Sequence, residues 1–259
     1  MTDGPEVRYE VSGSVATLTL DRPEQRNRLT LEGMRALTGA IARAGADDDV
    51  RVVVLTGEGS TFCAGADLAA AASADDFAGD GPSLLAAALE ALLDLPKPTI
   101  ARVQGHVAGG GNGLVAACDI AVASSDARFA FSEVRVGVAP AVISVTCLQV
   151  MHRRAAQELL LTGDRVDAQR ALEAGLVTRV APPEALDAVV AGYVDSLVQG
   201  GPEALARTKE LLRRIPAIPR EEAFATAARM SAETFASAEA REGMTAFLER
   251  RPAAWTSAD

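Results

Sequence analysis

The sequence predicts an α/β protein whose C-terminal region is helical, and three observations support this class. In the first half, short apolar runs alternate with segments whose apolar residues recur every three or four positions. Such alternation is typical of strands that are joined by helices. Glycine-rich turns follow two of the apolar runs. From Ser144 onward the helical period continues almost unbroken, so we expect helices alone in that part.

The first elements are a β-hairpin and a long helix. Apolar and polar residues alternate over 7–11 and again over 15–20, and a Ser-Gly pair between them favours a turn. Thr30 has the type of side chain that helix N-caps prefer, and a periodic apolar face follows it. We therefore expect a hairpin and then a helix over 30–46.

The rest of the chain predicts strands that lead into helices, followed by a series of helices. The predicted strands are residues 51–56, 99–104, 119–123 and 177–180. The predicted helices between them are a short one from about Asp67 and two over 83–95 and 112–118. The small, polar and acidic stretch 71–81 favours a mobile loop. C-terminal helices are predicted over 144–152, 155–161, 167–173, 183–199, 202–213, 220–236 and 239–249.

Composition and charge exclude several kinds of partner. The 259 residues carry a net charge of −10 and no dense basic patch, which argues against nucleic acid. The N-terminus lacks the basic start and apolar stretch of a signal peptide, and no run of about 18 apolar residues predicts a membrane span. Three sparse cysteines fit a reducing cytoplasm. Two distant histidines without a carboxylate cluster predict no metal site.

Two glycine-bearing loops are the strongest candidates for a functional site. Residues 61–67 and 105–113 each follow a predicted strand and precede a predicted helix. The start of a helix exposes backbone N–H groups, and the helix dipole favours negative charge there. Gly65 and the triplet 109–111 allow a ligand to approach the main chain closely. The two loops together predict a pair of backbone donors for an oxygen that becomes negatively charged.

Two other interpretations of the loops stay open. Each loop alone is equally well explained as a tight strand-to-helix turn. A phosphate-binding loop is the second alternative, although neither segment matches G-x-G-x-x-G with a following acidic partner or G-x-x-x-x-G-K-[ST]. We expect His106, beside the triplet, to make a structural hydrogen bond. Cys63 has no adjacent base, so we expect it to pack in the interior.

Five segments that span most of the chain resemble the crotonase family, the enoyl-CoA hydratase/isomerase superfamily. Residues 22–29 (RPEQRNRL) are similar to an early family motif, and 62–68 (FCAGADL) to its first oxyanion loop. Residues 97–119, with the glycine triplet, resemble the second oxyanion loop. Residues 127–137 resemble the segment with the catalytic glutamate, and 242–250 (EGMTAFLER) the C-terminal helix.

The resemblance implies a fold, an assembly and a substrate class. Residues 1–200 would form a spiral core of repeated ββα turns, and residues 201–259 a helical region for trimerisation and active-site cover. The chain would assemble as a homotrimer or as a homohexamer of stacked trimers. The substrate would be an acyl-CoA thioester, so that coenzyme A enters as part of the substrate and no separate cofactor is implied.

The same resemblance implies roles for individual residues. The N–H groups of Ala66 and Gly110 would hold the thioester oxygen, and Glu133 would be the acid/base. Residues implied to contact the CoA ester are Arg26, Arg28, Ala64, Ala66, Asp67, Leu68 and Gly110, with Phe247 and Arg250 reaching the CoA of a neighbouring subunit. Solvated surface positions remain an alternative for the arginines, as does an ion pair of Glu133 with Arg135 or Arg128.

The sequence departs from the commoner family pattern at two places. Many hydratases of this family carry a second glutamate just after the glycine triplet, where this chain has Gly113. Residues 137–144 lack the usual glycine-rich stretch and look like the methylglutaconyl-CoA hydratase branch, which keeps one glutamate. We therefore expect an enoyl-CoA hydratase with a single glutamate. An enoyl-CoA delta-isomerase and a non-catalytic acyl-CoA-binding protein are the alternatives.

Overall fold

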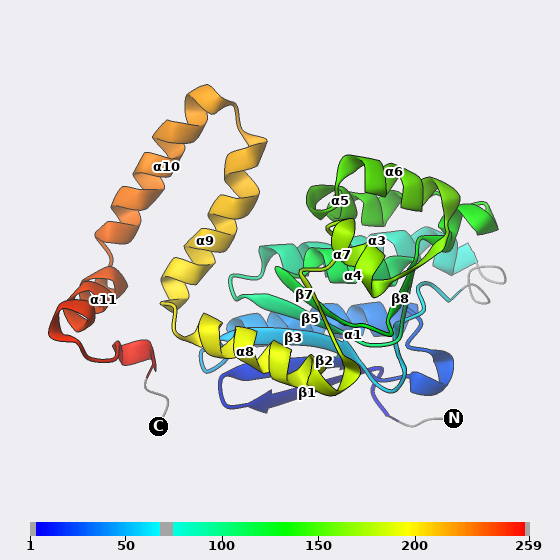
Figure 1. The fold of residues 1–259 in the computed structure, drawn as a ribbon, viewed down its shortest axis with the longest axis horizontal. Coiled ribbons are helices and arrows are strands. Elements are labelled where there is room, and N and C mark those ends of the chain that lie inside the picture. The colour runs from blue at the N-terminus through cyan, green and yellow to red at the C-terminus, as the bar shows by residue number, and fades with distance from the viewer. Residues whose placement is uncertain (1–3, 68–74, 257–259) are drawn as a thin grey trace.

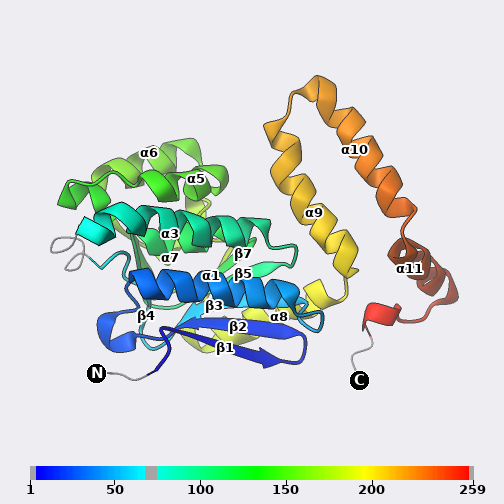
Figure 2. The same cartoon turned by 180° about the vertical axis from the view of Figure 1, so that it is seen from behind.

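The computed structural model describes residues 4–67 and 75–256. Two sheets covered by helices form the body, and three C-terminal helices extend from it as an arm (Figures 1 and 2). The larger sheet has six strands in the order β1-β2-β3-β5-β7-β10. These strands are β1 (Val7–Ser12), β2 (Val15–Leu20), β3 (Val52–Gly57), β5 (Thr99–Val103), β7 (Ile120–Ser124) and β10 (Arg179–Ala181).

A second sheet was not predicted from the sequence. It has the order β4-β6-β8-β9. Its strands are β4 (Thr61–Cys63), β6 (His106–Ala108), β8 (Arg128–Ala130) and β9 (Arg165–Asp167). Each spans three residues, which is too short for a period of two to stand out from the loops around it.

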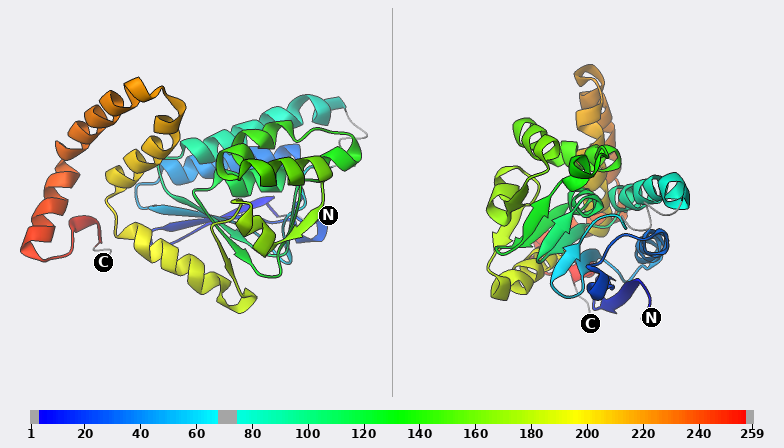
Figure 3. Two further views of the ribbon diagram at one scale, coloured as in Figure 1. Left: turned by 45° about the horizontal axis from the view of Figure 1, so that its top comes forward. Right: turned by 90° about the vertical axis from the view of Figure 1, so that its right-hand side faces the viewer.

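The two sheets and the helices together form a spiral of ββα turns. β3 leads to β4 and then α3 (Asp75–Asp94), and β5 leads to β6 and then α4 (Gly110–Ala117). β7 leads to β8 and then α5 (Ala141–Val150). Successive turns pair in parallel, β3 with β5 and β5 with β7 in one sheet, and β4 with β6 and β6 with β8 in the other. Figure 3 shows the sheets enclosed by helices, and the predicted α/β spiral is confirmed.

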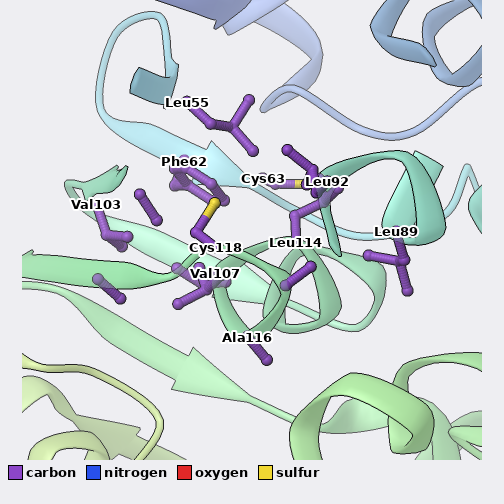
Figure 4. Close-up of a cluster of buried hydrophobic side chains, with 14 of the residues drawn as sticks. Leu55, Phe62, Cys63, Leu89, Leu92, Val103, Val107, Leu114, Ala116 and Cys118 are labelled. Atoms are coloured by element: carbon purple, nitrogen blue, oxygen red, sulfur yellow. The ribbon is translucent and has the colours of Figure 1, made fainter. Parts of the chain in front are cut away.

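Both faces of the central strands β3, β5 and β7 are buried, which explains why these strands have nearly continuous apolar sequences. Val53 and Leu55 face the main core inside the spiral, whereas Val52 and Val54 face a smaller core. Helix α8 (Leu186–Val198) covers that second face. In the main core, side chains from β3, β4, α3 and α4 meet, as Leu55, Phe62, Leu92 and Leu114 show in Figure 4. This packing fixes α4, whose first turn belongs to the second glycine loop.

Several predicted elements are confirmed, with boundaries that differ by a few residues. The hairpin pairs Val7 with Leu20 and Ser12 with Val15. Helix α1 (Leu31–Ala46) begins after Thr30, whose side chain accepts a hydrogen bond from Gly33 N at 2.9 Å. The other helices are α6 (Arg153–Thr162), α7 (Ala168–Glu173), α9 (Pro202–Arg214), α10 (Arg220–Phe235) and α11 (Ala238–Glu249), with short 3-10 turns η1 (Pro23–Gln25), η2 (Ser132–Val136), η3 (Pro183–Ala185), η4 (Ile215–Ala217) and η5 (Ala254–Thr256).

The prediction of a loop before α3 is wrong. We expected a loop over 71–81, but residues 75–81 belong to α3, and Pro82 lies inside the same helix. Contacts with distant residues favour a helix through this stretch, because Gly81 is buried and Arg35 of α1 lies 3.5 Å from Asp80. The short helix that we expected from about Asp67 falls on residues 68–74, which lie outside the described residues.

The arm of α9, α10 and α11 begins at Pro202 and returns to its own base. The guanidinium of Arg51 donates to Gly200 O at 2.7 Å and to Trp255 O at 3.0 Å. The Glu239 carboxylate of α11 accepts the N–H groups of Glu203 and Ala204 in the first turn of α9, each at 2.9 Å. These contacts join the end of the arm to its base, and Figure 1 shows the arm as an arch. The division of the chain at residue 200 into two domains stays a prediction.

The arm exposes large apolar side chains. Those more than two-thirds exposed are Leu212, Phe224, Phe235, Phe247 and Leu248. Among the described residues, no helix combines the length and the apolar character that crossing a membrane requires.

Candidate active site

The two glycine loops and the predicted acid/base residue meet at one cavity of about 370 Å³. Ala64 to Ala66 line it from the first loop, and Gly109 and Gly110 from the second. Ser132 and Glu133 line it from η2. Positions 66, 110 and 133 come from three successive turns of the spiral, so the stacking of these turns brings them together.

The first loop is held in place by residues 26–29, which lie alongside it. Leu29 N donates to Gly65 O at 2.7 Å, and Asp67 N donates to Leu29 O at 3.2 Å. Since successive peptide groups of an extended chain point to opposite sides, the N–H of Ala66 points away from Leu29. Ala66 is exposed and lines the cavity. This pairing therefore orients the N–H of Ala66 independently of any ligand.

The side chain of Asn27 holds the start of the first loop through hydrogen bonds. Its Nδ2 donates to Glu58 O at 2.9 Å and to Thr61 O at 2.6 Å, and its Oδ1 accepts from Arg22 N at 2.9 Å. Asn27 is buried and has a φ of 52°, a conformation that asparagine tolerates better than most residues. The sequence motif contains this residue, but its structural role follows only from the long-range contacts.

In the second loop, Gly109 and Gly110 have different roles. Gly109 has φ 50° and ψ −123°, which only glycine adopts without strain. Its N–H donates to Ala130 O at 3.2 Å. Gly110 is the first residue of α4, so its N–H has no acceptor within the helix and lies at the positive end of the helix dipole. A Cβ atom at position 65 would lie 2.8 Å from Ala108 O, so the loops touch.

Asn112 connects the second loop to the strand that leads to Glu133. Its Nδ2 donates to Ala130 O at 2.8 Å, the same carbonyl that Gly109 N contacts. The side chain is fully buried. Sequence reasoning did not assign this role, because the partner lies on a strand that the sequence did not predict.

Glu133 places a carboxyl group beside both loops. A Cβ atom at Gly109 would lie 3.5 Å from Glu133 Oε1. Oε2 is buried and has no hydrogen-bond partner among the described residues. Burial raises the pKa of Glu133, and a backbone hydrogen bond opposes this only in part. The alternative ion pairs are absent from the described residues, because Arg135 pairs with Asp164 and Arg128 donates to the carbonyls of 126 and 127.

The raised pKa of Glu133 predicts that stability depends on pH. Between the ordinary carboxyl pKa and the raised value, the folded state binds more protons than the unfolded state. The free energy of unfolding therefore falls as the pH rises through this window. Glu133→Gln removes the titrating group, so we expect the variant to be more stable than wild type at neutral pH. Denaturant unfolding of both proteins from acidic to neutral pH tests this, and parallel pH curves would contradict it.

The other residues predicted to contact the CoA ester lie at different places relative to the cavity. Ala64 lines the cavity, and Asp67 lies beside it with Oδ2 3.0 Å from Arg28 Nε. Arg26 is exposed and, like Arg28, does not line the cavity. Leu68 lies outside the described residues.

Phe247 lies in α11, and Arg250 is the residue that caps the C-terminal end of this helix. Neither lines the cavity of its own chain. Phe247 is 83% exposed. Figure 1 shows α11 on the arm, away from α4. The role of these two residues in binding the CoA ester stays a prediction.

Neither Cys63 nor His106 lines the cavity. Cys63 is fully buried, which raises the pKa of its thiol to about 12 and removes it as a nucleophile at neutral pH. His106 is exposed on β6 and does not line the cavity. Among the described residues, no group of three or more His, Cys, Asp or Glu side chains is placed to hold a metal ion.

Comparison with known proteins identifies the family. The family described as enoyl-CoA hydratase/isomerase matches residues 10–258. The enoyl-CoA hydratase EchA19 of Mycobacterium tuberculosis is 35% identical over 254 residues, which cover 96% of this chain and 95% of that protein. The (E)-benzylidenesuccinyl-CoA hydratase of Thauera aromatica is 32% identical over 259 residues, covering 97% and 99%.

A solved structure gives the same result. The crystal structure of an enoyl-CoA hydratase from Mycobacterium smegmatis superposes with a TM-score of 0.92 at 36% identity and covers 98% of this chain and 100% of that one. The sequence match and the matching fold both extend over nearly the whole chain. The chain belongs to the enoyl-CoA hydratase/isomerase family.

Proposed function

We propose that the protein hydrates α,β-unsaturated acyl-CoA thioesters. The observation that carries this proposal is an apolar cavity in which Glu133 lies beside two loops that offer backbone N–H groups, with its Oε2 buried and without a hydrogen-bond partner among the described residues. Family membership supports the thioester substrate, and relatives named as hydratases support the reaction. The cavity is large enough for an acyl group and its thioester.

The N–H groups of Ala66 and Gly110 hold the thioester oxygen in this proposal. When water adds at C3, negative charge moves through C2 to that oxygen and forms an enolate. Donors that are fixed before the reaction stabilise this charge without reorganising, and each is typically worth about 3 kcal/mol in the transition state. The pairing of Leu29 with the first loop and the start of α4 supply that rigidity.

Glu133 carries the proton in both directions. Its carboxylate takes a proton from water as the oxygen bonds to C3, and the carboxyl group that results gives a proton to C2 of the enolate. One group serves both steps because it becomes an acid once it has acted as a base. A pKa raised toward neutrality suits both roles, and the burial of Glu133 acts in that direction.

The same residue could instead move a proton between C2 and C4, which is double-bond isomerisation. A comparison of crotonyl-CoA with 3-hexenoyl-CoA as substrates tests the proposal. We expect 3-hydroxybutyryl-CoA from crotonyl-CoA. Formation of 2-hexenoyl-CoA without any hydration would assign an isomerase, and saturable CoA-ester binding without turnover of either would assign a binding protein.

We further propose that the arm mediates self-association into a trimer or a hexamer. The exposed Phe224 and Phe235 support an apolar interface, because aromatic side chains of this size are seldom left in solvent. Phe247 and Arg250 would then contact the CoA bound by a neighbouring subunit. We place the protein in the cytoplasm, since its three cysteines are free and buried.

The cavity predicts that the acyl group is uncharged. Glu133 is the one ionisable group among the described residues that line it, and residues 1–3, 68–78 and 257–259 include no Lys, Arg or His. An acyl carboxylate would therefore meet Glu133 with no cation among the described residues that line the cavity. The sequence resemblance to the methylglutaconyl-CoA hydratase branch stays a prediction, and this lining does not favour it.

Two substrates that differ by one carboxyl group test this prediction. We expect kcat/KM for 3-methylcrotonyl-CoA to exceed that for 3-methylglutaconyl-CoA by about 10²-fold, because an unpaired carboxylate loses its hydration next to a like charge. A preference for the methylglutaconyl ester would contradict this prediction and would show that a cation reaches the pocket.

A further inference from the structure

Gly113 lies where α4 packs against Ile143 of α5. It sits inside α4, so its backbone conformation alone does not call for glycine. A Cβ atom there would lie 2.6 Å from Cγ2 and 3.1 Å from Cβ of Ile143, and 3.3 Å from Cδ1 of Leu89. A real Cβ could not occupy this space without moving Ile143. The glycine is therefore required by the neighbouring side chain.

Further contacts hold Ile143 in this position. One turn later on α5, Thr146 Oγ1 lies 3.2 Å from Gly113 O, and Cys147 Sγ lies 3.7 Å from Asn112 O. Both side chains are buried, so α5 is fixed against α4 without solvent between them. Ile143 itself is 2% exposed. Its place thus depends on the helix pair and not on a mobile rotamer at the surface.

Ile143 also forms part of the cavity wall. Gly113 lies three residues beyond Gly110, which is about 4.5 Å further along α4 at 1.5 Å per residue. Val136 and Val138 also line the cavity and are more than half exposed, whereas Ile143 is buried, so we infer that the cavity opens near the two valines. A thioester held at Gly110 with its CoA toward solvent would direct its acyl chain inward, toward Ile143.

We propose that Ile143, seated against Gly113, closes the inner end of the acyl pocket and sets how long an acyl chain the enzyme accepts. This inference rests on the proposed binding of enoyl-CoA esters at the cavity. It assigns a role in substrate specificity to a contact between two residues that are 30 positions apart. It also explains why position 113 is glycine without reference to proton transfer.

The test compares Ile143→Ala with Leu148→Ala over a series of 2-enoyl-CoA esters from crotonyl to decenoyl. Leu148 lies on the same helix, is 58% exposed and does not line the cavity, and its replacement removes the same number of carbon atoms. We expect Ile143→Ala to raise the ratio of kcat/KM for octenoyl-CoA to that for crotonyl-CoA by at least about 10-fold. Leu148→Ala should leave this ratio at the wild-type value.

An unchanged ratio in Ile143→Ala, with crotonyl-CoA activity retained, would overturn the inference. Ile143→Val, which removes one carbon atom, should give a smaller shift in the same direction and serves if the alanine variant fails to fold. If wild type hydrates none of the esters, the proposed function fails. The affinities of butyryl-CoA and octanoyl-CoA for wild type and variant then test the role of Ile143 separately, with an equal change for both ligands counting against it.

Discussion

Glu133→Gln is expected to lower kcat for crotonyl-CoA hydration by about 10²–10⁴-fold, the usual effect of losing one general acid/base group. Glutamine keeps the size of the side chain but cannot take a proton from water. Since Glu133 is the one ionisable group among the described residues of the cavity wall, we expect no neighbour to replace it.

Two controls make this result specific. The dissociation constant for butyryl-CoA, which lacks the double bond, should change little, because the variant keeps the cavity and its backbone donors. Glu90→Gln, an exposed position on α3, makes the same change of charge and should retain wild-type activity. Turnover by Glu133→Gln at the wild-type rate would remove Glu133 from the mechanism.

Gly110→Pro should lower kcat by about 10²–10³-fold, which is the usual effect of removing one oxyanion donor. Proline lacks the N–H and is well tolerated at the first position of a helix, which is where Gly110 lies. The substitution therefore deletes the proposed donor while keeping the start of α4. Measured values of kcat and KM for crotonyl-CoA give the effect directly.

Gly110→Ala is the matched control for this variant. Both substitutions add a Cβ atom, which would lie 2.8 Å from Leu29 Cδ1 and 3.3 Å from Leu85 Cδ2, at the ends of flexible side chains. Alanine keeps the N–H, whereas proline removes it and places its ring Cδ where the hydrogen pointed. We expect a much smaller loss in the alanine variant, and equal losses in the two would mean that crowding, not the donor, is responsible.

The parts of the fold that follow local rules were predictable from the sequence. The hairpin and α1 combine a clear apolar period with a turn or an N-cap, and both are confirmed. The second sheet was missed because three-residue strands such as β4 are stabilised by neighbours far along the chain. α3 includes a Gly- and Pro-containing stretch whose contacts, such as that of Asp80 with Arg35 of α1, come from a distant segment that local composition does not reveal.

The candidate site was likewise predictable from the sequence only in part. The loops around Gly65 and Gly110 were recognisable because each joins a strand to a helix, and the resemblance pointed to Glu133. The isolation of Oε2 and the supporting bonds of Asn27 and Asn112 depend on contacts between distant segments. The contact between Gly113 and Ile143 also lies beyond sequence reasoning, which could only note that glycine replaces a family glutamate.

The most direct test of the account is hydration in water enriched in heavy oxygen. Wild type is incubated with crotonyl-CoA, and the product is analysed by mass spectrometry after fragmentation. We expect 3-hydroxybutyryl-CoA that carries the solvent oxygen at C3, formed at a rate that falls in Glu133→Gln and Gly110→Pro. If the substrate is bound but recovered unchanged, or only shifts its double bond without gaining oxygen, the protein is not a hydratase and the central claim is wrong.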